Sequence, residues 1–120
     1  MPLFIGLGSL FMAAAVALGA FGAHALKSKL EQDKLEVYKT GVLYHLIHAL
    51  GLIAVGLLAE QYPNAGLLAA AGWLLTAGIV LFSGSLYVLS VKRMRLLGPV
   101  TPLGGLSFII GWVLVAVSVL

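Results

Sequence analysis

Seven polar residues within long apolar stretches are the side chains of this chain that could do chemistry. They are three histidines and four hydroxyl residues: His24, Tyr44, His45, His48, Ser83, Tyr87 and Thr101. One subset recurs at a spacing of three or four residues: Gly41, Tyr44, His45, His48 and Gly51. This spacing predicts one face of a helix. Because imidazoles are costly in lipid, we expect that face to contact protein, and we predict that the seven residues form one polar pocket.

The histidines fit two kinds of site. In the first, they form hydrogen bonds across helices to Ser83, Tyr87, Thr101 or backbone carbonyls, which are common contacts in membrane proteins. In the second, His24 approaches His45 and His48 from a neighbouring helix, and the three imidazoles bind zinc, copper or haem. No carboxylate or thiol lies at the same depth to complete such a site. We therefore assign no metal and no cofactor.

Catalysis has weaker support than either kind of histidine site. A histidine beside Ser83 would resemble a base and a nucleophile, but no acidic residue is placed to orient the base, and no G-x-S-x-G turn is present. The chain also lacks cysteine, which excludes thiol nucleophiles and disulfides. We expect no catalytic residues and no enzymatic activity.

The elements that must position these residues follow from the composition. The chain has 120 residues, of which 62% are hydrophobic and 9% are charged. A soluble domain has roughly 25% charged residues, so this chain cannot cover a water-facing surface. Its charges leave uncharged stretches over 1–26, 40–59, 61–91 and 96–120. Each stretch is long enough for a membrane-spanning helix, which needs about 20 residues.

The predicted fold is therefore all-α: a polytopic membrane protein with a four-transmembrane-helix bundle and a single membrane domain over 1–120. We place the spans at roughly 3–25, 40–59, 67–91 and 102–120. The connection over 26–39 contains no glycine or proline and has charge pairs at helical spacing, such as Glu36 with Lys39. We expect an interfacial helix there; a continuation of the first or second span would use the same pairs.

The basic residues predict an orientation. All seven lie in the first and third connections: Lys27, Lys29, Lys34, Lys39, Lys92, Arg93 and Arg95. The positive-inside rule then makes loops 26–39 and 92–97 cytoplasmic and both termini non-cytoplasmic. The predicted polar pocket would lie in the cytoplasmic half of the membrane. The net charge of +3 follows from these loops, and because no basic stripe with interleaved aromatic residues exists, we expect no nucleic-acid binding.

Small residues mark the expected contacts between helices, because lipid-embedded helices associate by close backbone packing. The first span has two such faces, one with Gly8, Ala15, Gly19 and Gly22, and the other with Gly6, Ala13, Ala17, Ala20 and His24. Gly41 on the second span and Gly104, Ser107, Gly111 and Ser118 on the fourth extend the pattern. Two small faces on one helix predict two neighbours. Besides the lipid bilayer, the expected partner is a second copy or a larger membrane protein.

Several ordered motifs carry a resemblance over essentially the whole chain: Gly19-Ala20-Phe21-Gly22-Ala23-His24, Tyr44-His45, His48-Ala49-Leu50, Phe82-Ser83-Gly84-Ser85-Leu86-Tyr87, Thr101-Pro102-Leu103-Gly104-Gly105 and Gly111-Trp112. With these motifs the chain resembles the small membrane-protein family typified by bacterial YgdD-like and YwdK-like proteins, to which transmembrane protein 256 of animals is similar. The resemblance implies a four-helix protein of the bacterial inner membrane. Since the family has no known function, it supplies no catalytic or binding residues.

The interpretation that combines these observations is a non-enzymatic structural or accessory bundle. A small-molecule or lipid carrier or channel, acting as an oligomer, is the alternative. Proton coupling in such a carrier would fall to histidine, because the spans hold no Asp, Glu, Lys or Arg. Histidine-based metal or haem binding is the second alternative.

Overall fold

The computed structural model describes residues 1–63 and 65–120, which are helical apart from short connections. The elements follow in the order α1 (Pro2–Phe21), η1 (Gly22–Leu26), α2 (Gln32–Leu58), α3 (Ala65–Gly78), η2 (Ile79–Ser83), α4 (Gly84–Val91), η3 (Arg95–Leu97) and α5 (Val100–Val119). Four continuous helical segments, over 2–26, 32–58, 65–91 and 95–119, are long and apolar enough to cross a membrane. The predicted all-helical fold with four apolar spans is confirmed.

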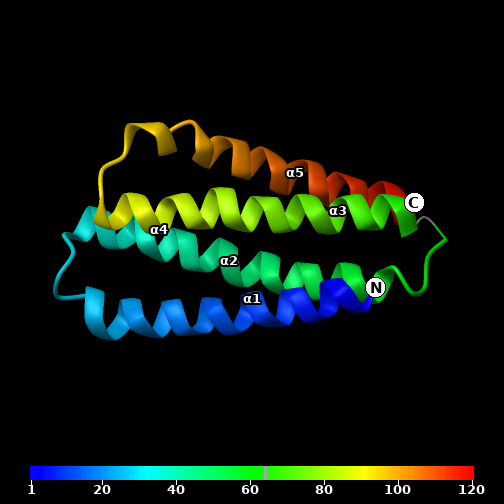
Figure 1. Ribbon diagram of the computed structural model, residues 1–120, viewed down its shortest axis with the longest axis horizontal. Coiled ribbons are helices and arrows are strands. Elements are labelled where there is room, and N and C mark those ends of the chain that lie inside the picture. Colours follow the sequence, from blue (N-terminus) through cyan, green and yellow to red (C-terminus); the bar gives the residue numbers. More distant parts are fainter. Residues whose placement is uncertain (64) are drawn as a thin grey trace.

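The four segments run antiparallel and lie side by side in chain order (Figure 1). Helix α1 packs on α2, α2 packs on α3, η2 and α4, and α5 packs on α3 and η2. The molecule measures 49 × 27 × 18 Å, so the bundle is flattened. The segments α2 and α3–η2–α4 are therefore inner helices, whereas α1 and α5 are peripheral. Both termini lie at one end of the molecule, and both basic connections lie at the other, which we call the basic end (Figure 1).

The first connection differs from the expected interfacial helix over 26–39. The first span ends in the π-helical turn η1, and α2 begins at Gln32 and continues into the second span. Residues 32–39 therefore form an N-terminal extension of the second span. Its first turns bury Leu35 and Tyr38, and the ring of Tyr38 packs against Gly22 of η1. This burial fixes the segment to the bundle instead of leaving it free to lie on the membrane surface.

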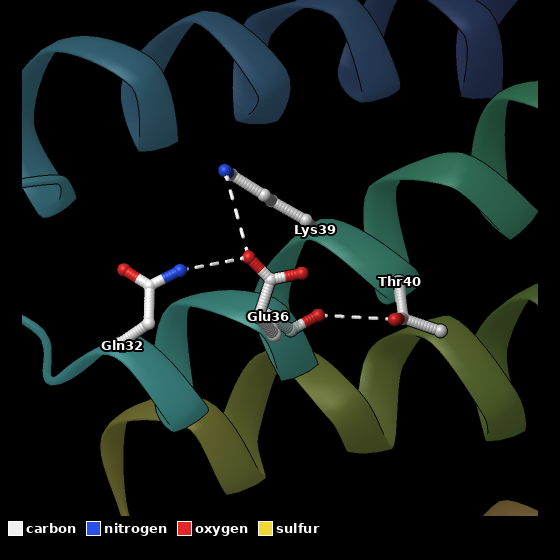
Figure 2. Close-up of polar contacts among 4 residues, drawn as sticks. All are labelled: Gln32, Glu36, Lys39 and Thr40. Carbon is white, nitrogen blue, oxygen red and sulfur yellow. Dashed lines mark hydrogen bonds and ion pairs between the residues drawn. The ribbon is translucent and has the colours of Figure 1, made fainter.

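Polar contacts support the first turns of α2 on their exposed side (Figure 2). The carboxylate of Glu36 accepts a hydrogen bond from Nε2 of Gln32 at 3.0 Å and lies 3.8 Å from Nζ of Lys39. The hydroxyl of Thr40 donates to the backbone oxygen of Glu36 at 3.0 Å. Each such pair adds a few tenths of a kcal/mol, about 0.2–0.5, so together they extend the helix beyond the apolar stretch.

Buried side chains divide along the length of the bundle. The apolar core contains Phe4, Leu52, Val55, Leu68, Leu75, Ile79 and Phe108. It extends from the middle of the bundle toward the end that holds the termini. Most of the buried polar side chains lie between this core and the basic end. Most of the buried polar side chains of the described residues therefore lie between the middle of the bundle and the basic end.

All six glycines predicted to pack helices lie at close helix contacts: Gly8, Gly19, Gly22, Gly41, Gly104 and Gly111. The closest approach to another backbone among these six is at Gly104, where an added Cβ would lie 2.3 Å from the backbone nitrogen of Phe82. Helix α5 thus crosses η2 with backbone against backbone. This crossing sets the position of α5 relative to both inner helices.

Candidate functional site

The seven predicted pocket residues do not form one pocket. The structure divides them among a buried histidine–tyrosine pair, an aromatic groove, a hydroxyl contact between α4 and α5, an enclosed serine and an exposed histidine. The reason is that an inner helix contacts protein on two sides. On α2, His45 is directed toward α1 and α4, whereas Tyr44 and His48 are directed toward η2 and α5.

The buried pair joins α2 to α4. Nδ1 of His45 lies 2.7 Å from the hydroxyl oxygen of Tyr87, and either group can be the donor according to the imidazole tautomer. Gly41 makes room for the Tyr87 ring, since an added Cβ would lie 3.0 Å from it. The Tyr38 ring lies beside that of Tyr87 with centroids 5.3 Å apart, and its hydroxyl donates to the Leu18 carbonyl of α1. This network connects three helices near the basic end.

The aromatic groove lies between α2, η2 and α5 and has a volume of about 300 Å³. Its lining residues are Tyr44, His48, Phe82, Gly105, Phe108, Ile109 and Trp112. The imidazole of His48 is stacked on the Phe108 ring at a centroid distance of 3.5 Å, and the nearly parallel Tyr44 ring lies 5.9 Å from the imidazole and 6.4 Å from Phe108. Trp112 lies 5.8 Å from the same imidazole. The groove was not foreseen as aromatic, because Phe82, Phe108 and Trp112 come from two helices whose rotation the sequence does not give.

One imidazole nitrogen of His48 is already used. Nδ1 donates to the backbone carbonyl of Tyr44 at 2.7 Å, because a carbonyl oxygen can only accept. In the neutral ring, Nε2 is then a hydrogen-bond acceptor. It has no partner among the described residues, and it is not one of the fully enclosed polar atoms. The groove therefore contains one accessible acceptor within a wall of aromatic carbon.

The serines of the third span differ from the prediction. Helical periodicity places Ser85 on the face opposite Ser83 and predicts a bond back to the Leu81 carbonyl. In the structure Ser85 is buried against α5 and lies 2.6 Å from the hydroxyl oxygen of Thr101. It also donates to the Phe82 carbonyl at 2.9 Å. Ser83 is fully buried, and its hydroxyl has no partner among residues 1–63 and 65–120. An outward face was assigned to Ser85 because α4 was assumed to contact protein on one side only.

His24 lies apart from the other histidines. It is exposed in η1, on the side of the first span that does not face α2. The three-imidazole cluster is therefore not assembled, and the described residues contain no group of three or more His, Cys, Asp or Glu side chains that could hold a metal ion. Nor does the Ser83 hydroxyl form a hydrogen bond with an imidazole in the described part of the chain.

The depth of the groove also differs from the expectation. His48 lies near the middle of α2, and Phe108 lies near the middle of α5. At about 1.5 Å per residue, His48 is about 15 Å from Leu58 and Phe108 is about 12 Å from Val100, the nearer end of each helix. The groove therefore opens near mid-depth of the apolar segments, while the His45–Tyr87 pair lies nearer the basic end. Because α2 begins at Gln32 and not at residue 40, His48 lies about 24 Å from the start of its helix instead of about 12 Å.

Comparison with known proteins gives consistent matches. The family model described as "Protein of unknown function (DUF423)" matches residues 18–105, a range that includes all seven predicted pocket residues. The chain is 52% identical over 118 residues to the UPF0382 membrane protein YwdK of Bacillus subtilis, covering 98% of this chain and 96% of the relative. It is 45% identical over 119 residues to the UPF0382 membrane protein SH2409 of Staphylococcus haemolyticus, covering 98% and 95%. No solved structure matches the chain.

Proposed function

The chain belongs to the DUF423 family of UPF0382 membrane proteins, whose function is unknown, and from this premise we propose a non-enzymatic accessory role: α1 docks against another transmembrane helix. The observation that carries this proposal is a second small-residue face on α1 that is exposed in the structure of residues 1–63 and 65–120. A partner helix of this chemistry is provided either by a second copy of the chain or by a larger membrane protein.

The two small faces of α1 have opposite surroundings. Gly8, Ala15 and Gly22 are buried, and at Gly8 an added Cβ would lie 2.8 Å from the Ala49 carbonyl of α2. On the other side of the helix the small residues are exposed: Gly6, Ala13, Ala14, Ala17 and Ala20. Small side chains gain little contact with lipid tails but allow a second helix backbone to approach closely. The exposed alanine face is bracketed by the larger Leu10 and Phe21.

The contacts of the polar side chains support a non-enzymatic role. His45 is bonded to Tyr87, His48 to a backbone carbonyl, and Ser83 has no base beside it. The His45–Tyr87 bond joins two helices, and such bonds stabilise membrane bundles by about 0.6 kcal/mol each, whereas the His48 bond lies within α2. These bonds account for the two imidazoles within the spans without a reaction.

For location, the proposal is a multi-pass protein of the bacterial inner membrane with both termini on the non-cytoplasmic side. The connections within 26–39 and 92–97 would then face the cytoplasm. All seven Lys and Arg residues gather at the basic end, which supports this orientation through the positive-inside rule.

Single-cysteine cross-linking in native membranes tests the docking face. The chain has no cysteine, so Ala17→Cys introduces one thiol on the exposed alanine face. Ile109→Cys on α5 is a matched control, because it is exposed and lies a similar number of residues from the basic end. We expect a discrete cross-linked product from Ala17→Cys and none from Ile109→Cys. Adding Ala13→Leu to Ala17→Cys should abolish the product by blocking close approach.

The mass of the product distinguishes the two sources of the partner helix. A product of twice the mass of the chain indicates a second copy, and a larger product that contains a second protein indicates an accessory subunit. Equal products from Ala17→Cys and Ile109→Cys, or no product from either, would contradict the proposal.

A small-molecule or lipid carrier acting as an oligomer is a second candidate, and the observation that favours it is the groove open to lipid beside His48. Histidine-based metal or haem binding has support from that imidazole alone, because His24 and His45 are directed elsewhere. Both alternatives predict occupancy of the groove, whereas the docking proposal depends on α1.

A further inference from the structure

We propose that the aromatic groove binds a neutral phenol dissolved in the membrane, with the phenol hydroxyl donating a hydrogen bond to Nε2 of His48. The term phenol here means an aromatic ring that carries a hydroxyl group on an otherwise apolar body. This inference goes beyond the accessory role of α1, since it concerns a different face of the molecule and a small ligand.

The first argument is the unused acceptor of His48. This side chain is 4% exposed, and its Nδ1 proton is held by the Tyr44 carbonyl at 2.7 Å. That bond selects the tautomer in which Nε2 carries a lone pair. An acceptor that has no partner in an apolar groove is unfavourable, and a ligand that donates a hydrogen bond to it removes part of that cost. The free nitrogen thus selects for a hydrogen-bond donor.

The second argument is the shape and chemistry of the walls. The imidazole is held by near-parallel stacking, with interplanar angles of 13° to Phe108 and 8° to Tyr44. Phe82 and Trp112 complete the wall, and Phe82 lies 4.8 Å from the Tyr44 ring. Flat rings favour offset or edge contacts with another aromatic ring. An apolar cavity of about 150 Å³ is known to hold benzene. The volume of about 300 Å³ is therefore sufficient for a substituted ring.

The third argument is depth. His48 and Phe108 lie near the middle of their helices, so a ligand reaches them through the hydrocarbon region of the bilayer. Charged ligands and ligands with many polar groups are costly at this depth. An aromatic ring with one hydroxyl can partition into lipid and still satisfy one acceptor. Among groups that can donate a single hydrogen bond, the phenol combines that donor with the flat ring that the walls favour.

The test uses a pair of probes that differ only in the donor: 4-bromophenol and its methyl ether, 4-bromoanisole. Bromine quenches tryptophan fluorescence at short range, and the chain has two tryptophans, Trp73 and Trp112. In Trp73→Phe, Trp112 reports on the groove; in Trp112→Phe, Trp73 reports on partition into lipid. The full chain is reconstituted in lipid nanodiscs at neutral pH, and concentrations are expressed per lipid.

We expect 4-bromophenol to quench Trp112 saturably. Its concentration in the lipid at half-saturation should be about fivefold to tenfold lower than that of the ether, because one hydrogen bond of about 1 kcal/mol provides a factor of this size. Trp73 should be quenched without saturation, as it lies nine residues before Phe82 on the same span, about 13 Å along the axis. Equal half-saturation for phenol and ether would overturn the proposal, as would saturation at Trp73. A haem absorption band in the purified chain would also overturn it, because haem would occupy Nε2.

Three variants, each made in Trp73→Phe, separate the acceptor from the walls. His48→Phe keeps an aromatic ring in the stack and removes Nε2, so phenol and ether should become equal. Gly105→Leu fills the groove and should abolish saturable quenching by both probes. Gly84→Leu is the matched control, since an added Cβ there meets nothing within 4 Å, and it should behave as the parent. A phenol preference that survives His48→Phe would contradict the assignment of the acceptor. If His48→Phe does not fold, the probe pair in Trp73→Phe alone and Gly105→Leu still decide.

Discussion

Replacement of Gly104 by alanine should lower the free energy of unfolding by about 2 kcal/mol, which is within the usual range for overpacking. The cause is the crossing of α5 over η2. An added Cβ at Gly104 would lie 2.3 Å from the backbone nitrogen of Phe82 and 2.8 Å from its Cα. A side chain could rotate away from such a contact, but backbone atoms cannot.

The size of the effect follows from how far the helices must separate. Ordinary contacts begin at 3.4 Å, so α5 and η2 must move apart by about 1 Å at this point. A gap of that size forfeits about a quarter to a half of the dispersion energy of each contact along the crossing. The separation of the helices also lengthens the hydrogen bond from the Ser107 hydroxyl to the Leu74 carbonyl, which is 2.6 Å in the parent, at a cost of about 0.6 kcal/mol.

The matched control is the adjacent Gly105→Ala. There an added Cβ would lie 3.7 Å from the nearest atom of the Phe82 ring, an ordinary contact, so the stability should stay within about 0.5 kcal/mol of the parent. The assay is titration of the purified protein with dodecyl sulfate in mixed micelles, followed by circular dichroism and by Trp112 fluorescence. Equal transition midpoints for Gly104→Ala and Gly105→Ala would refute the reasoning that backbone contact sets this crossing.

Two further predictions concern the polar network and the orientation. Tyr87→Phe removes the hydroxyl that contacts Nδ1 of His45 and should lower stability in the same titration by about 1 kcal/mol. The control Tyr44→Phe loses no hydrogen bond among the described residues and should change stability by less than half of that. Similar losses in both variants would contradict a stabilising His45–Tyr87 pair. An alkaline phosphatase fused after Leu120 should be active, and a reporter that works only in the cytoplasm should be inactive there, because the basic connections are expected to face the cytoplasm. The reverse result would refute the orientation.

The spans and the packing faces were predictable from the sequence because membranes impose simple rules. Charges interrupt the apolar stretches, so the four helices were predicted within several residues, with the largest difference at the start of α2. The two faces of α1 followed from helical periodicity. The structure places Gly8 against α2 and leaves Ala17 exposed, as expected for faces on opposite sides of one helix.

The grouping of the polar residues was not predictable, because periodicity gives the face of a helix but not the neighbour that the face contacts. Tyr44 and His45 are consecutive residues about 100° apart around α2, and in an inner helix both directions contact protein. The prediction joined them in one pocket, whereas the structure separates them between α5 and α1. For the same reason, Ser85 was expected to face away from the bundle, although α5 covers it.

The π-helical turn η2 has a consequence for how the chain length is constrained. A wide turn of this kind accommodates one additional residue within a continuous helix. Deleting one residue between Ile79 and Ser83 would restore regular α-helical bonding and leave α4 close to its present rotation, whereas deleting one residue from the regular helix α3 would rotate α4 by about 100°. Tyr87 would then leave Gly41, and Ser85 would leave Thr101. The connections between spans and the wide turn η2 can therefore gain or lose a residue, whereas the number of residues in α3 is fixed by the contacts that α4 makes.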